Sequence, residues 1–204
     1  MKDIERTNNE MRLENKVALV TASTRGIGLA CAKRLAQEGA TVYMGARNIE
    51  RAQEIADSLN KEGYNVKVVY NDATVKESYK SMVEEVVKNE GKIDVLVNNF
   101  GTSNPKKDLD IKSTEYEEFM GTVDLNLSSV FLASQAAILH MAANGGGSII
   151  NISSIGGICP DISADHFLEL RIAVGSCDYS HMIIKCIQKQ VIVPIISAVI
   201  IFSL

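Results

Sequence analysis

The chain has 204 residues, of which 46% are hydrophobic, so it is long and apolar enough to bury the core of one domain. A formal net charge of −4 excludes the basic surface that binding to nucleic acid or an anionic membrane requires. Four scattered cysteines form no CxxC pair and have no nearby histidine ligands, so neither a disulfide framework nor a metal site is expected. The first ten residues, MKDIERTNNE, lack the apolar core of a secretory signal, and a cytoplasmic location is therefore expected.

The first predicted element is a strand that runs into a glycine-containing turn and a helix. The apolar run Val17–Val20 predicts a buried strand, and apolar residues then recur at helical spacing up to Gly39. A helix N-terminus presents unpaired N–H groups and positive potential to an anion, while Gly26 and Gly28 let the backbone approach a pyrophosphate. By itself, the turn is compatible with a dinucleotide site or with a plain tight turn.

Strands and helices then alternate along the chain. Further strands are predicted at Thr41–Gly45, Asn65–Tyr70, Asp94–Asn98 and Ser148–Ile152, and helices at Ile49–Asn60, Thr74–Asn89 and Thr114–Ala143. Thr74 with Glu77, and Thr114 with Glu117, predict capping boxes at the starts of the last two helices. Because parallel strands need helical crossovers, five such units predict an α/β fold, a doubly wound parallel sheet with helices on both faces.

Ligands bind such sheets beyond the carboxyl ends of the strands. Each predicted strand ends in residues suited to that edge. They are Thr21–Gly28, Gly45-Ala46-Arg47, Asn71-Asp72-Ala73, Asn98-Asn99-Phe100-Gly101 and Ser153-Ser154. Five such ends at one edge favour a binding site over five unrelated turns.

These segments resemble the short-chain dehydrogenase/reductase family, over about residues 11–163. TASTRGIG at residues 21–28 is similar to its TGxxxGIG loop, with Ala22 in place of the first glycine, and NNFG at residues 98–101 is similar to its NNAG motif. Within the family, the segments ENKVALVTASTRGIGLA, IDVLVNNFG and GGGSIINISSIGG resemble bacterial NADP-dependent 7α-hydroxysteroid dehydrogenases. The resemblance implies a Rossmann-like fold and interconversion of a secondary alcohol and a ketone on a small, steroid-like substrate such as a bile acid.

The resemblance also implies the site residues. Ser154 matches the active-site serine and Asn126 the helix asparagine, which would support a water-linked proton path. The implied cofactor-binding residues are Thr21, Ser23, Thr24, Arg25, Gly26, Ile27, Gly28, Arg47, Asp72, Ala73, Asn98, Asn99 and Gly101. Family members pair through the long helix at about Thr114–Ala143, which implies a homo-oligomer.

The end of the second strand indicates which nicotinamide cofactor is preferred. An acidic residue there would accept hydrogen bonds from the NAD ribose and repel a 2′-phosphate. The matching residue is Ala46, followed by Arg47, and Arg25 lies in the neighbouring loop. Two guanidiniums suit a phosphate, so NADP(H) is predicted; the alternative is that both arginines only cover solvated helix starts.

The expected proton donor is missing from its position. The family places a tyrosine thirteen residues after the serine and a lysine four residues later, and these positions hold Phe167 and Arg171. Phenylalanine has no ionisable group, and arginine stays protonated with a different donor geometry. A general acid commonly contributes about 10²- to 10⁴-fold to the rate, so most activity is expected to be lost.

The family resemblance ends near Ser163, which divides the chain into three segments. These are a polar extension at 1–10, a dinucleotide-binding domain at 11–163 and a divergent apolar segment at 164–204. Val191–Leu204 is apolar and β-branched, which indicates either a surrogate core strand or an aggregation-prone tail. The resemblance implies later strands that are not recognisable after Ser163, so the C-terminal strands are expected to be incomplete. The alternative to an active oxidoreductase is a truncated or frameshifted, catalytically inactive nucleotide-binding fragment.

Overall fold

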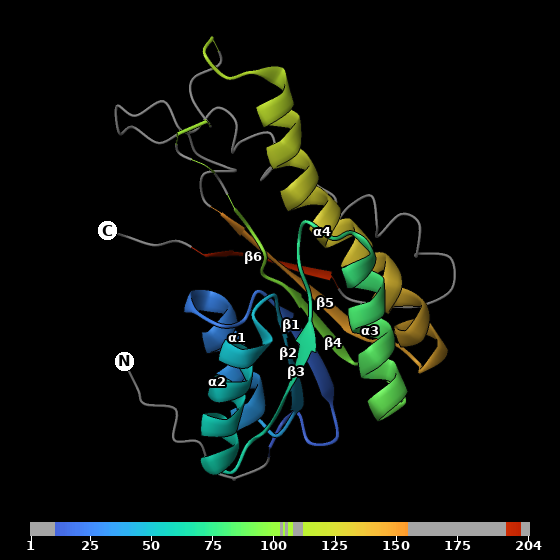
Figure 1. The fold of residues 1–204 in the computed structure, drawn as a ribbon. Coiled ribbons are helices and arrows are strands. Elements are labelled where there is room, and N and C mark those ends of the chain that lie inside the picture. The colour runs from blue at the N-terminus through green and yellow to red at the C-terminus, as the bar shows by residue number, and fades with distance from the viewer. Residues whose placement is uncertain (1–10, 103, 105, 108–111, 155–194, 201–204) are drawn as a thin grey trace, which may run out of the picture.

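The computed structural model describes residues 11–102, 104, 106–107, 112–154 and 195–200. Strands and helices alternate through this part of the chain (Figure 1). In chain order they are β1 (Val17–Thr21), α1 (Gly26–Gln37), β2 (Thr41–Ala46), α2 (Ile49–Lys61), β3 (Asn65–Tyr70), α3 (Glu77–Glu90), β4 (Val95–Asn98), α4 (Tyr116–Ala143), β5 (Ser148–Ser154) and β6 (Ile195–Ile200).

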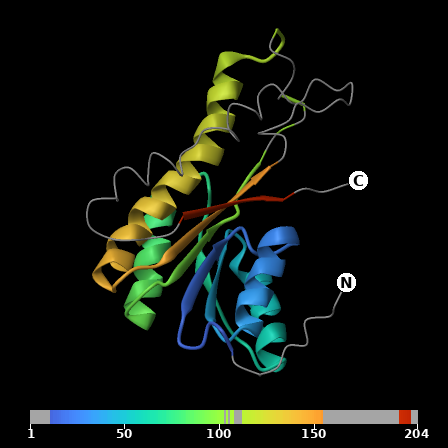
Figure 2. The ribbon, with the colours of Figure 1, turned by 180° about the vertical axis from the view of Figure 1, so that it is seen from behind.

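The strands form one parallel sheet in the order β3-β2-β1-β4-β5-β6. The order reverses between β1 and β4, which is the topological switch point where ligands bind in a doubly wound fold. Helices α1 and α2 cover one face of the sheet, and α3 and α4 cover the other (Figures 1 and 2). The predicted Rossmann-like architecture is confirmed.

Each face of the sheet has its own apolar core, because alternate side chains of a strand point to opposite faces. On the α3/α4 face, Leu19, Leu96 and Ile149 pack with Ala137 and Met141 of α4. On the α1/α2 face, the core contains the intervening strand residues, together with small helix residues such as Ala32 and Ala56. The central strands are therefore apolar on both sides, as a parallel sheet requires.

A carboxylate ties the amino ends of β1 and β4 together at the edge opposite the predicted site. Asp94 Oδ2 accepts a hydrogen bond from the backbone N–H of Val17 at 2.9 Å, and Lys16 and Lys92 each approach the carboxylate to 3.1 Å. Burial raises the pKa of Asp94, but these donors outweigh it and hold the pKa below its usual value. This edge is structural, which leaves the carboxyl edge for binding.

Both predicted capping boxes are wrong. Helix α3 begins at Glu77 with Lys76 as N-cap, and α4 begins at Tyr116 with Glu115 as N-cap; neither N-cap side chain makes a capping hydrogen bond. Thr74 instead donates its hydroxyl to Asp72, at 2.8 Å. A local turn therefore uses the side chain that the capping box needed.

The apolar segment near the C-terminus supplies the sixth strand, as one of the two interpretations of its sequence predicted. Strand β6 pairs in parallel with β5 from Ile149↔Ile195 to Ser154↔Ile200. This segment lies outside the part of the chain that resembles the family, yet β6 extends the sheet beyond β5. Phe167 and Arg171 lie outside the described residues.

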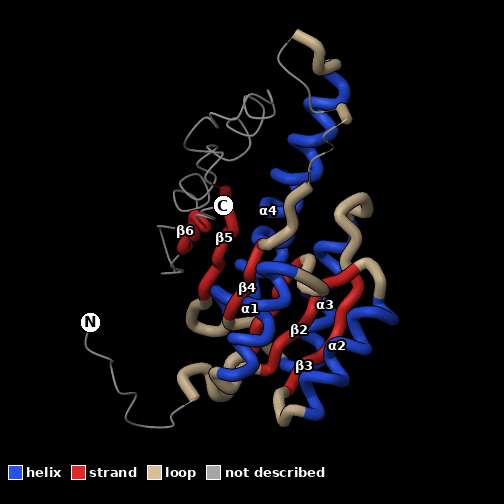
Figure 3. Tube along the Cα trace, turned by 90° about the vertical axis from the view of Figure 1, so that its left-hand side faces the viewer, coloured by secondary structure: helices blue, strands red, loops and turns tan. Residues whose placement is uncertain are grey.

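Helix α4 extends beyond the carboxyl ends of the strands (Figure 3). It is long and apolar enough to cross a membrane, a test that core helices of soluble proteins also pass. Its C-terminal half packs against the sheet through Ala133, Ala137 and Met141, all completely buried. This packing accounts for the apolar character of that half of the helix.

Candidate cofactor and active site

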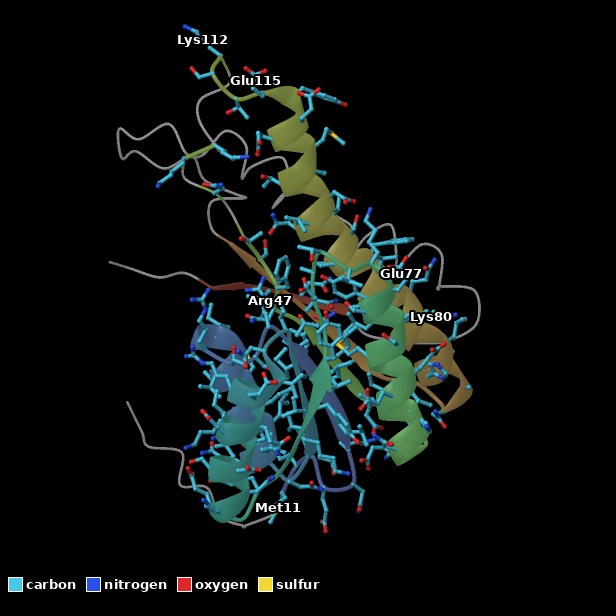
Figure 4. All side chains as sticks on the ribbon, viewed as in Figure 1. Met11, Arg47, Glu77, Lys80, Lys112 and Glu115 are labelled. Carbon is cyan, nitrogen blue, oxygen red and sulfur yellow. The ribbon has the colours of Figure 1, made fainter. Side chains whose placement is uncertain are left out.

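The structure places the predicted site residues at the carboxyl edge of the sheet. Arg47 follows β2 at this edge, and Met11 lies beyond the opposite edge of the sheet (Figure 4). The turn after β1 and the segments after β3 and β4 lie at the same edge, because all these strands are parallel. The convergence that the sequence predicted is therefore present.

The turn between β1 and α1 has two residues in left-handed conformation. Ala22 has φ +50° and Gly26 has φ +53°. A Cβ built on Gly26 meets no atom within 4 Å, whereas one built on Gly28 would lie 2.4 Å from Asn99 Nδ2 and 2.6 Å from the Ala22 carbonyl oxygen. Gly28 is thus required for packing within the protein, while Gly26 leaves open space at the helix start.

Asn99 and Thr21 join the ends of β4 and β1 across the switch point. Thr21 Oγ1 accepts hydrogen bonds from the backbone N–H groups of Asn99 and Phe100, at 2.9 and 3.2 Å. In return, Asn99 Nδ2 donates to the carbonyl oxygens of Thr21 and Ala22, at 3.2 and 3.1 Å. These four bonds hold the turn in one conformation before any ligand arrives.

The start of α1 has the properties of an anion site. Its N-cap residue, Arg25, makes no side-chain capping bond, and the first turn contains no acidic residue. The N–H groups of that turn therefore remain available to an anion, with the helix dipole in support. Arg25 and Arg47 are both exposed, and Ser23 Oγ is buried without a partner among the described residues. This donor set fits a dinucleotide phosphate group.

Asp72 is ionised and held in a tight turn after β3. Its Oδ1 accepts hydrogen bonds from the Thr74 backbone N–H at 2.9 Å and the Thr74 hydroxyl at 2.8 Å. These bonds, with a smaller contribution from the positive charge of Arg47, hold the pKa of Asp72 below its usual value. Ser78 Oγ also accepts a hydrogen bond from the backbone N–H of Asp72 and donates one to the Asp72 carbonyl oxygen. The half-buried Ala73 follows in the same turn.

Asn126 of α4 holds the chain that leaves β4. Its Oδ1 accepts from the Thr102 N–H at 2.8 Å, and its Nδ2 donates to the carbonyl oxygens of Thr102 and Thr122, both at 2.8 Å. A Cβ built on Gly101 would lie 3.6 Å from the same Oδ1. The Asn126 side chain therefore fixes the loop beside the site. Its part in a proton path stays a prediction.

One buried connection was missed by the sequence analysis. Asn98 Nδ2 donates to Ser134 Oγ at 3.0 Å and to Asn151 Oδ1 at 2.9 Å, which links β4 to both α4 and β5. The available signal was the polar residue inside the apolar run of β5, three positions before Ser154. Its partner could not be identified without the register of the two strands.

Comparison with known proteins identifies the family. The family model described as short chain dehydrogenase matches residues 16–165. The chain belongs to the short-chain dehydrogenase family. It is 55% identical over 144 residues to a 7α-hydroxysteroid dehydrogenase of Paraclostridium sordellii, covering 71% of this chain and 54% of that protein. It is 48% identical over 165 residues to the enzyme of that name from Clostridium sardiniense, covering 81% and 63%.

The fold is also shared with solved members of this group of enzymes. A gluconate 5-dehydrogenase from Burkholderia cenocepacia, crystallised with NADP and tartrate, superposes with a TM-score of 0.80 at 26% identity. The alignment covers 95% of this chain and 74% of that one. Members of this family bind a nicotinamide cofactor. It spans somewhat more than half the length of the two curated relatives above.

The catalytic positions that the family resemblance implies are only partly within the described residues. Ser154 is the last residue of β5, at the carboxyl edge as predicted. Tyr79 is buried in the core on the α3/α4 face, and burial raises its pKa to about 12. Among the described residues, no three His, Cys, Asp or Glu side chains are grouped to hold a metal ion.

Proposed function

We propose that the chain is an NADP(H)-dependent oxidoreductase that interconverts a secondary alcohol and a ketone on a hydroxysteroid, such as a bile acid. The substrate class is supported by the two relatives named as 7α-hydroxysteroid dehydrogenases, at 55% and 48% identity. The observation that carries the cofactor preference is the sequence and exposure at the end of β2. Strand β2 ends in Ala46, which offers no carboxylate, and the exposed Arg47 follows it directly.

Charge at the carboxyl edge favours the additional phosphate of NADP(H). The positive charge of Arg47 makes a small contribution to the lowered pKa of Asp72, so Arg47 lies near that carboxyl at the same edge. Arg25 stands at the uncapped start of α1. Two arginines near one phosphate provide charge-assisted, bidentate hydrogen bonds, and no acidic residue replaces Ala46 to repel it.

The remaining site residues would orient the substrate and cofactor. Asn99 and Thr21 hold the turn that receives the pyrophosphate, and Asn126 holds the loop that borders the site. Ser154 would bind the substrate oxygen at the end of β5. The nicotinamide, when bound, supplies the hydride, and the protein must supply a proton to the oxygen that receives it.

A second candidate function is favoured by the residues at the expected proton-donor positions. Phe167 and Arg171 stand where the family has its tyrosine and lysine. A chain with an intact nucleotide half and no general acid would bind NADP(H) without efficient turnover. This candidate is a catalytically inactive nucleotide-binding protein.

Helix α4 supports the further proposal that the chain forms a homo-oligomer. Tyr116, Met120 and Phe131 are 68%, 40% and 37% exposed, and their spacing places them on one side of the helix. Three large apolar side chains on one helix face suit a self-complementary contact with a second copy.

Cofactor binding and turnover distinguish the two candidates. Purified protein is titrated into NADPH while the cofactor fluorescence is followed, and a 7α-hydroxylated bile acid is then added together with NADP. Binding with turnover supports the oxidoreductase, and binding without turnover supports the inactive binder. Equal affinity for NADPH and NADH would contradict the proposed cofactor preference, and an absence of binding would contradict both candidates.

A further inference from the structure

Strands β4 and β5 separate immediately after the pair Asn98↔Asn151. Their pairing runs from Val95↔Ser148 to Asn98↔Asn151, and β4 ends there. The chain after β4 continues as Asn99, which binds the turn after β1. Strand β5 instead continues for three more residues to Ser154, where it is paired with β6 and no longer with β4. The pair Asn98↔Asn151 is therefore the base of a fork between the cofactor side and the predicted substrate side.

The two side chains at the base of this fork are bonded to each other. Residues paired in parallel strands place their side chains on the same face of the sheet, and Asn98 Nδ2 donates to Asn151 Oδ1 at 2.9 Å. The second N–H of the same amide donates to Ser134 Oγ of α4 at 3.0 Å. One amide group thus connects both branches of the fork to the covering helix.

This amide is placed where an apolar residue would be better for stability. Asn98 is only 3% exposed. It lies two residues after Leu96 of the apolar pair Leu96↔Ile149, on the same face of the sheet. Its Oδ1 has no hydrogen-bond partner among the described residues, and burying an unpaired carbonyl oxygen costs free energy. The benefit of the amide is therefore geometric, since it holds the fork in one arrangement.

We propose that Asn98 and Asn151 are positioning residues, whose hydrogen bond sets the place of Ser154 relative to the cofactor turn. This role rests on the proposed function, because it concerns the two sides of that reaction site. The turn itself is held independently from β1, through Thr21 and Asn99. Loss of the bond should therefore affect the end of β5 and leave the cofactor turn in place.

Two neutral substitutions provide a matched test. Asn151→Ala removes the acceptor of the bond between the strands, whereas Ser134→Ala removes the other acceptor of the Asn98 amide and keeps the bond between the strands. Neither variant adds a charge, so they differ in which of the two bonds of Asn98 is lost. Amide hydrogen exchange is followed in the apo protein, in peptides covering 148–154 and in peptides covering 17–28.

We expect N151A to speed exchange at residues 152–154 at least tenfold, with less than twofold change in the β1 turn, and S134A to stay near wild type. Uniform acceleration across the sheet, equal effects in both variants, or the reverse order would overturn the proposal. Should N151A not fold, Asn151→Val, which also removes the acceptor and suits a strand, takes its place with the same expected result.

Ligand measurements separate this proposal from the proposed function. N151A and S134A are expected to bind NADPH with equal Kd, within about twofold. Where wild type shows turnover, kcat should fall at least tenfold in N151A relative to S134A, with KM for NADPH unchanged, because small misplacements of reacting groups cost about 10²-fold. If wild type binds no NADPH, the proposed function fails while the exchange comparison still decides the role of the bond.

Discussion

Replacing Ala22 with glycine is expected to stabilise the protein, and replacing Gly26 with alanine is expected to destabilise it by a similar amount. Both residues belong to the turn between β1 and α1, and their φ angles are nearly equal, +50° and +53°. The left-handed conformation costs an L-residue about 1–2 kcal/mol, because its Cβ approaches the carbonyl oxygen. Glycine avoids this cost but loses about 0.5–1 kcal/mol more in backbone entropy on folding.

The net change follows from these two opposing contributions. A22G should gain about 0.5–1 kcal/mol, which corresponds to an increase in Tm of about 2 °C for a chain of this length. G26A should lose about the same, since a Cβ at that position meets no atom within 4 Å and adds only backbone strain. Gly28→Ala is the steric control, because its Cβ would lie 2.4 Å from Asn99 Nδ2. Overpacking should make this variant the least stable, by about 1–3 kcal/mol.

Thermal and urea denaturation of the three variants, followed by circular dichroism, measure these changes. The same proteins are titrated with NADPH. A22G should keep the wild-type Kd, and G26A should bind more weakly, because its new methyl group occupies the open space beside the helix start. A destabilised A22G, or a G26A variant as stable as wild type, would refute the assignment of strain to this turn.

Three further predictions concern the cofactor, acid stability and the proton donor. Arg47→Ala should weaken NADPH binding about 10- to 100-fold in fluorescence titrations, because a charge-assisted hydrogen bond to the 2′-phosphate is lost. Its affinity for NADH should stay unchanged, and the control Arg51→Ala should bind NADPH as wild type does. Asp94→Asn should lower the free energy of unfolding at pH 7 by about 1 kcal/mol. The pKa of Asp94 is lowered in the folded protein, so its ionised carboxylate stabilises the fold above the usual pKa of 3.8, and this stabilisation is lost as the pH falls below that value. The urea midpoints of wild type and D94N should therefore converge in acid. Phe167→Tyr with Arg171→Lys should raise turnover of a 7α-hydroxylated bile acid about 10²- to 10⁴-fold; no increase would place the defect elsewhere.

The sequence predicted the fold because its signals are local and repeated. The apolar run before Gly26 and the helical spacing after it each need only a few residues to be read, and the crossover rule then orders the strands. The predicted helix starts were wrong because they depend on contacts that the local sequence does not determine. Thr74 can cap a helix or bond to Asp72, and the choice depends on how β3 leads into α3. The Asn98–Asn151 bond was inaccessible because it depends on strand register, which joins residues far apart in the chain.

Cofactor binding and turnover should be separable in this chain, since different residues control them. The turn after β1 is held by bonds to Asn99, and the start of α1 is left open to an anion, so the described residues complete the nucleotide half. The family resemblance implies that the proton donor would stand at position 167, where phenylalanine offers no ionisable group. Binding energy that is equal in the ground and transition states lowers KM without raising kcat. An intact nucleotide half therefore cannot compensate for the missing acid, and near-normal affinity for NADPH with a much reduced kcat is the expected kinetic signature.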